Sequence, residues 1–95
     1  MDEETLYTVE AARKFKLTKV VINFVADTAF DVEVIIKRGI RNIVPREGYI
    51  SGDSGTIEVN AEEEISSGER IIVYWKNNNA TTDKKFFVLI EGELM

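Results

Sequence analysis

Apolar and polar residues alternate with a period of two along much of this chain, which is the pattern of half-buried β-strands. The alternation is clearest from residue 30 to 37, and it returns at 56–61, 70–76 and 86–93. We therefore expect four strands there, each with one face toward a core. The inward residues predicted by this phase are Phe30, Val32, Val34, Ile36, Ile57, Val59, Ala61, Ile71, Val73, Trp75, Phe86, Val88 and Ile90.

Three further strands are predicted from less regular segments. Residues 6–9 form a short one, and residues 14–26 form a long one whose alternation changes phase partway. A β-bulge near Thr18-Lys19 would bring both halves of the long strand onto one face. Residues 40–44 form a weaker strand that ends at Pro45, because proline cannot donate to a ladder.

Turn residues separate these runs. Arg38-Gly39 is predicted to join two strands, residues 47–55 a flexible loop with a possible short strand at Tyr49-Ile50, and residues 76–85 an exposed hairpin loop. Single helical turns are possible at 10–16 and 61–65, but neither keeps a period of 3.6. The chain is predicted to be all-β: one domain over residues 1–95, a two-sheet antiparallel β-sandwich with seven or eight strands and a jelly-roll-like topology.

Composition narrows the possible functions. The 95 residues contain neither Cys nor His, so we expect no disulfide, no zinc site and none of the usual nucleophile–base pairs of enzymes. Acidic residues outnumber basic ones by 17 to 12, and the net charge of −5 disfavours nucleic-acid binding. We see no secretory signal and no apolar run near the roughly 20 residues that span a bilayer, so we expect no membrane partner. The absence of Gln beside plentiful Glu, Lys, Arg, Ile and Val hints at a thermophilic host.

The carboxylates do not suggest a reaction. Asp31, Glu33 and Glu58 alternate outward on predicted strands, where a solvated face is favoured over a glycosidase pair. The segments 51–55 and 62–64 are interpreted as a turn and a solvated edge rather than cation sites. We therefore predict a protein that is not an enzyme and uses no cofactor or metal.

Two basic groups and one aromatic pair leave alternatives open. The cations at 13, 14, 16 and 19, and at 37, 38, 41 and 46, would bind phosphate only if the fold gathered them, and salt pairing with the abundant acids is favoured. Trp75 is in phase with the core residues of its strand, so packing is favoured over a sugar-stacking platform made with Tyr74 or Tyr49.

The most informative feature is an excess of apolar residues on the predicted outward side of several strands. A sandwich needs one buried face per strand. Here the residues of the opposite phase are apolar as well, and Val21 and Val25 add to them. Either loops of the same chain cover these residues, or they form a subunit interface or docking face. The candidate interface residues are Ile35, Ile72, Tyr74, Phe87 and Leu89.

Several segments resemble small β-sandwich virion proteins of tailed phages, of the capsid decoration, head-fibre and tail-associated types. The similar segments are residues 6–11 (LYTVEA), 17–22 (LTKVVI), 27–34 (DTAFDVEV), 65–74 (ISSGERIIVY) and 87–93 (FVLIEGE). The chain departs from the pattern in carrying Glu10 where Pro is common, Ala12 where Gly is common and Ala26 where Asn is common.

The resemblance implies a non-enzymatic virion structural protein, assembled in the host cytoplasm. It would bind the major capsid protein or another virion protein as a homo-oligomer, with a trimer expected, as a capsid decoration or cement protein. It would display the loops 47–55 and 77–85. Two alternatives are a small ligand-binding module, such as a carbohydrate-binding domain, and a subunit of a cellular or extracellular filament.

Overall fold

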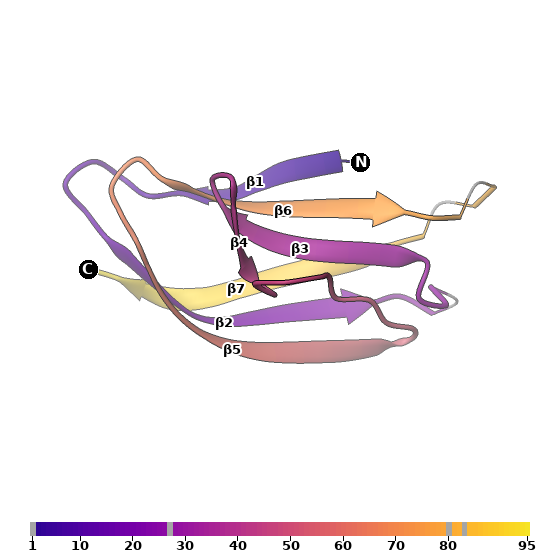
Figure 1. The fold of residues 1–95 in the computed structure, drawn as a ribbon. Helices are drawn as coiled ribbons and strands as arrows, with labels where there is room; N and C mark the ends of the chain where they lie inside the picture. Colours follow the sequence, from indigo (N-terminus) through magenta and orange to yellow (C-terminus); the bar gives the residue numbers. More distant parts are fainter. Residues whose placement is uncertain (1, 27, 80, 83) are drawn as a thin grey trace.

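The computed structural model describes residues 2–26, 28–79, 81–82 and 84–95, and seven strands form two antiparallel sheets (Figure 1). The four-stranded sheet has the order β1-β6-β3-β4 and the three-stranded sheet the order β5-β2-β7. The strands are β1 (Asp2–Thr8), β2 (Phe15–Phe24), β3 (Val32–Arg38), β4 (Arg41–Val44), β5 (Gly55–Ile65), β6 (Arg70–Asn77) and β7 (Phe86–Leu94).

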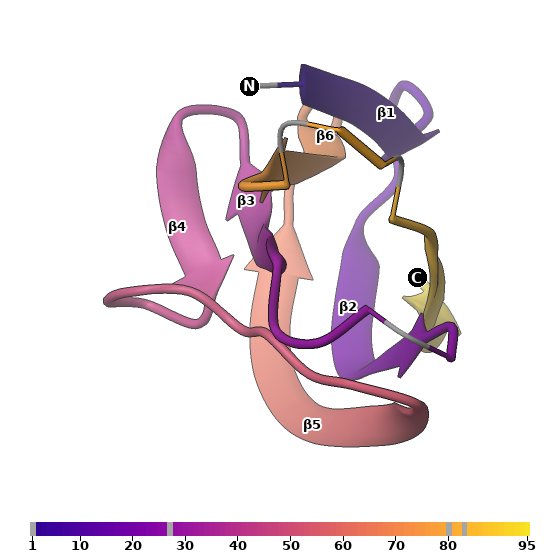
Figure 2. The same cartoon turned by 90° about the vertical axis from the view of Figure 1, so that its right-hand side faces the viewer.

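The two sheets pack face to face as a sandwich, which confirms the predicted fold class. The molecule is elongated, with extents of 45 × 22 × 20 Å. Viewed along the strands, β1 and β7 lie together at one lateral edge of the sandwich and β4 and β5 at the other (Figure 2). The jelly-roll topology is not confirmed, because that fold has eight strands in two Greek keys and the described sheets contain four strands and three.

One apolar cluster fills the space between the sheets. Its members are the alternate residues of β2, β3 and β6, together with Val9, the end of β4 and the last residue of β5. In β2, Leu17 and Val20 are both fully buried although three positions separate them. The register shifts between Leu17 and Lys19 against both neighbouring strands, so the predicted bulge is confirmed.

Three local predictions are wrong. Phe30 does not continue the inward row of β3; it is 63% exposed and lies in a turn at φ 61°. Residues 61–65 extend β5 rather than forming a helical turn, since Phe15 to Leu17 pair with them. The predicted hairpin loop at 76–85 is not one, because Lys76 and Asn77 belong to β6 and the next strand, β7, lies in the other sheet.

Other connections follow the sequence closely. The β3–β4 hairpin turns at Gly39, whose φ of 60° suits glycine, and Ile40 is its exposed tip. Pro45 ends β4, as expected. The predicted strand at Tyr49-Ile50 is reduced to a single bridge between Ile50 and Val34.

The β1–β2 and β5–β6 loops lie at one end of the sandwich, and the connections before β3 and after β6 lie at the other (Figure 1). At one end, Val9 exchanges backbone hydrogen bonds with the turn before β6, accepting from Gly68 and donating to Glu69. At the other end, the loop before β3 holds both loops that the resemblance would display. Its Phe30 N–H donates to the carbonyl of Gly52, and the carbonyl of Asp31 accepts from the N–H of Asn78.

Candidate interaction surface

The fold separates the five candidate interface residues onto two opposite outer faces. Ile35 in β3, with Ile72 and Tyr74 in β6, alternates with core residues of the four-stranded sheet and so points away from the core. Phe87 and Leu89 alternate with core-side residues of β7 and point out from the three-stranded sheet. These five side chains therefore do not form one surface.

The outer face of the four-stranded sheet is largely covered by the chain itself. Ile72 is only 4% exposed, and Ile35 and Tyr74 are half-buried. Lys37 pairs with Ile72 across the sheet, and its Nζ lies 4.1 Å from the centroid of the Tyr74 ring. Because Tyr74 is the diagonal neighbour, the alkyl chain of Lys37 runs over this part of the face while its charge meets the aromatic ring.

The outer face of the three-stranded sheet is open. Phe87 is 65% exposed and Leu89 is 57% exposed, and both lie in the edge strand β7. Val21 of β2 pairs with Leu89, and Asn23 pairs with Phe87. We call Val21, Phe87 and Leu89 the β7 patch.

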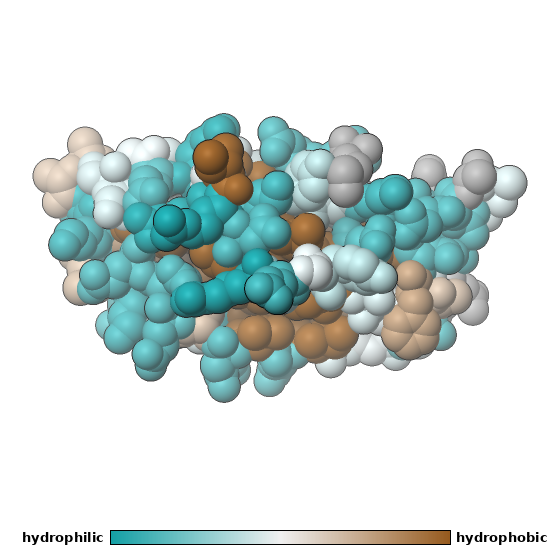
Figure 3. Space-filling view, viewed as in Figure 1, coloured by the Kyte–Doolittle hydropathy of each residue, from teal (hydrophilic) through white to brown (hydrophobic). Residues whose placement is uncertain are grey.

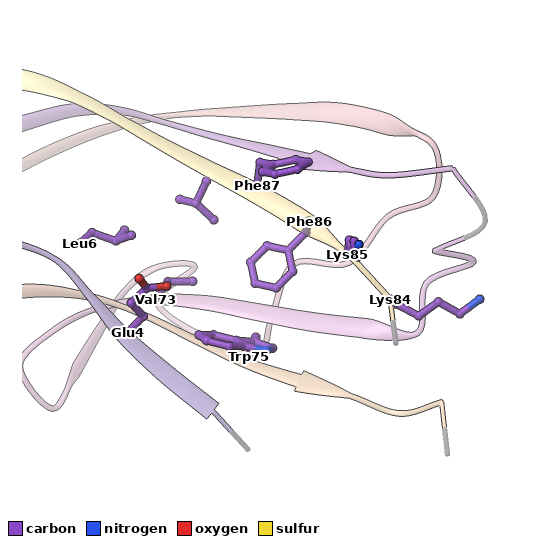
Figure 4. A pocket seen from close by; sticks show the side chains of 9 residues that line it. Glu4, Leu6, Val73, Trp75, Lys84, Lys85, Phe86 and Phe87 are labelled. Carbon is purple, nitrogen blue, oxygen red and sulfur yellow. The ribbon is translucent and has the colours of Figure 1, made fainter. Parts of the chain in front are cut away.

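A groove opens beside the patch, where β1 and β7 form the lateral edge. Its volume is about 460 Å³, and Leu6, Trp75, Phe86 and Val88 are among its lining residues. Phe86 and Phe87 point to opposite sides of β7, and Phe86 reaches into the groove toward Trp75 (Figure 4). The two rings meet edge to face with centroids 5.6 Å apart. The core-side residues of β7 are only half-buried because β7 is the edge strand of the sheet that the described residues form.

The opposite lateral edge is also open, but charged side chains line it together with apolar ones. A groove of about 360 Å³ lies between β4 and β5, with Ile43, Ile50 and Val59 in its lining. Apolar side chains show there between hydrophilic ones (Figure 3). Arg46 and Glu63 form an ion pair of 2.8 Å at this edge.

Two of the three carboxylates considered in the sequence, Asp31 and Glu33, accept hydrogen bonds from residues that follow β6. The carboxylate of Asp31 accepts a hydrogen bond from Asn79 Nδ2 (3.1 Å) and lies 3.8 Å from Lys84 Nζ. Glu33 accepts from Asn78 Nδ2 at 2.9 Å. Glu58 lies exposed on β5. Within the described residues, no three His, Cys, Asp or Glu side chains come close enough to hold a metal ion.

Arg38, one of the basic residues considered for a phosphate-binding patch, has a shifted pKa. Arg38 Nε donates to Glu69 Oε2 at 2.8 Å, and this bond raises the pKa of Arg38. The same bond lowers the pKa of Glu69, and the backbone N–H of Ser66, which donates to Glu69 Oε1, lowers it further. This cation is therefore occupied in a salt pair, as the sequence favoured.

The aromatic residues considered for sugar binding do not share a platform. Tyr74 and Trp75 are successive residues of β6, so their side chains lie on opposite faces. Lys37 lies over the Tyr74 ring, and Trp75 packs against Phe86 and the core. Tyr49 is 55% exposed in a separate loop.

Sequence reasoning missed the open lateral edges. The pattern placed Phe86 and Val88 in the core, and they do face it, but they also line the groove at the β1–β7 edge. Nothing in the alternation tells a central strand from an edge strand. Ile40, which is 99% exposed at the hairpin tip, was assigned to a strand and carried no signal of exposure.

Comparison of the chain with models of known protein families, with curated proteins and with solved structures found no match. In the part of the chain that the structure describes, no helix has the length and apolar character needed to cross a membrane.

Proposed function

We propose that this chain is a non-enzymatic structural protein that docks onto a larger protein assembly through the β7 patch. The observation that carries the proposal is the exposure of Phe87 and Leu89, two large apolar side chains adjacent on the outer face of one sheet. Burying such a side chain stabilises a complex by roughly 1.5–3 kcal/mol, which gives a partner protein a substantial reason to cover both.

The setting we propose is the surface of a virus particle, where the chain acts as a decoration or cement protein and as a homo-oligomer. The resemblance of five segments to small phage sandwich proteins supports this setting. The arrangement of the molecule is compatible with it: the patch lies on the flank of the sandwich, on the outer face of the three-stranded sheet, whereas the segment around Gly52 and the described residues that follow β6 lie at one end. Docking by the flank would leave these segments uncovered.

Co-sedimentation with capsids assembled from the coat protein of the same genome tests the proposal. We expect the chain to pellet with these particles, and the double variant Phe87→Ser/Leu89→Ser to lose most of this binding. Ile40→Ser/Tyr49→Ser is the matched control, because it also removes two exposed apolar or aromatic side chains, 99% and 55% exposed, from other parts of the surface.

The control variant is expected to bind as the unmodified chain does. No binding by the unmodified chain, or equal losses in both double variants, would contradict docking through the β7 patch. Circular dichroism of each variant verifies that the sandwich is retained.

A further inference from the structure

The two sheets have four edge strands, and three of them carry features that discourage pairing with another chain. β1 begins with three exposed acids, Asp2, Glu3 and Glu4. β4 is four residues long and is followed by Pro45. On β5 every second residue is polar and exposed, namely Thr56, Glu58, Asn60, Glu62 and Glu64. Charges, short strands and proline are the usual means of protecting a sheet edge.

The edge of β7 has none of these features between Lys85 and Glu91. The five residues between them, Phe86 to Ile90, are all apolar. Outward, Phe87 and Leu89 are exposed, and inward, Phe86, Val88 and Ile90 are half-buried. An open, apolar strand edge of this kind is a template for pairing with another strand.

In this same apolar stretch of β7, backbone N–H and C=O groups that do not bond to β2 point toward the open edge. The carbonyl of Lys85 accepts from the N–H of Val25 at 3.2 Å, and Met95 exchanges bonds of 2.7 and 3.3 Å with Lys14. Odd-numbered residues of β7 therefore face β2. Since successive residues of a strand alternate, the N–H and C=O groups of Phe86, Val88 and Ile90 face the open edge.

The charges at the two ends of this stretch favour a second copy of the same strand, in antiparallel orientation, as the partner. Lys85 precedes the apolar run and Glu91 follows it, and both are exposed. An antiparallel copy of the same strand places each lysine beside a glutamate, whereas a parallel copy places like charges together. We propose that β7 pairs antiparallel with β7 of a second copy of this chain, in a register centred on Val88.

In this register every pair is complementary. Phe86 and Ile90 exchange backbone hydrogen bonds with each other across the two-fold axis, and Val88 does so with its own copy. Phe87 of each chain faces Leu89 of the other, and Lys85 faces Glu91, at the closer type of antiparallel pair with Cα atoms about 4.5 Å apart. The result is one six-stranded sheet, in which the two β7 patches become one continuous apolar face.

This pairing rests on the proposed function, because it identifies a second copy of the chain as one partner of the β7 patch. It replaces the expected trimer with a pair, because a self-complementary edge closes on a two-fold axis. The paired stretch, residues 85–91, has fewer residues a side than the roughly 20–30 of a standard interface, so we expect monomer and dimer to exchange at micromolar concentrations.

Sedimentation velocity on the full chain, from about 1 μM to about 1 mM, measures the dimer dissociation constant. Lys85→Glu places two acids together at both ends of the interface, and Glu91→Lys places two lysines together. Each single variant should weaken the dimer about tenfold. The double variant Lys85→Glu/Glu91→Lys restores opposite charges only between two copies, so its dissociation constant should return to within about threefold of the original.

Glu58→Lys is the matched control, since it reverses an exposed glutamate on the opposite edge strand and should leave the dimer unchanged. A chain that stays monomeric throughout, or a double variant no better than the single ones, would overturn the pairing. Capsid binding is scored separately. A monomer that binds capsids through Phe87 and Leu89 retains the proposed function without the pairing, and a rescued dimer that binds no capsid retains the pairing without the function.

Discussion

The outer faces of the two sheets look alike in the sequence and differ in the structure. On both, apolar residues stand where an exposed face would be polar: Ile72 and Tyr74 on one, Phe87 and Leu89 on the other. Yet Ile72 is 4% exposed and Phe87 is 65% exposed. The difference shows that an outward apolar residue of this molecule is left exposed on the edge strand β7 and is buried on the central strand β6.

Strand order is the physical cause. β6 lies between β1 and β3, so Ile72 has Thr5 on one side and Lys37 on the other. Among the described strands β7 pairs with β2 alone, so Leu89 has Val21 beside it and no lateral neighbour on its other side. Lateral neighbours on a sheet stand about 5 Å away, close enough for a long side chain to cover an apolar one.

The largest effect on stability should come from truncating a side chain on the covered face of the four-stranded sheet. Ile72→Ala removes a buried side chain from a central strand, and we expect it to lower the free energy of unfolding by about 2–3 kcal/mol. Leu89→Ala on the open face should cost less than about 1 kcal/mol. Urea unfolding of both variants at low protein concentration measures the contrast, and equal losses would show that the two faces do not differ in burial.

A smaller effect tests what covers Ile72. Lys37→Ala removes both the alkyl chain and the cation over Tyr74, and we expect a loss of about 1 kcal/mol. Lys37→Met keeps an apolar chain of similar length, so it should recover about half of that loss. Urea unfolding again provides the measurement. If the methionine variant is no more stable than the alanine variant, the covering role of the alkyl chain is refuted.

The smallest effect concerns pH and the Arg38–Glu69 pair beside the covered face. The native pKa of Glu69 is lowered, so its stabilising contribution is complete above the ordinary glutamate pKa of about 4.3 and is lost as pH falls through the lower native value. Both side chains are partly exposed, which limits the contribution to less than about 1 kcal/mol. Comparing urea midpoints of the unmodified chain and Glu69→Gln should show a difference at pH 7 that shrinks toward pH 3; a difference that grows instead would contradict the lowered pKa.

Local chemistry made much of the fold predictable. The alternation located β3, β5, β6 and β7, and the phase change in residues 14–26 identified the bulge, because a buried face must stay continuous along a strand. Pro45 and Gly39 marked the end of β4 and its turn. The prediction that Phe30 faces the core failed because alternation cannot show where a strand begins, and here a left-handed turn precedes Val32.

The candidate surface was only half predictable. Residues facing outward follow from the period of two, but their cover depends on which strands become neighbours. The residues of β6 pair with residues 62–73 positions earlier in β1 and 33–45 positions earlier in β3, a relation that no local pattern encodes. The sequence therefore named Phe87, Leu89 and Ile72 together without separating them.

The path of the chain between the sheets has a consequence for biosynthesis. Among the described strands, only β3 and β4 are consecutive members of one sheet; every other connection passes to the opposite layer. Distant segments must meet before either layer can form, and folding on the millisecond-to-second scale is expected for such non-local β-topologies. β7 follows the other six described strands in the chain, so Phe87 and Leu89 are synthesised only after β2, the strand that they pair beside.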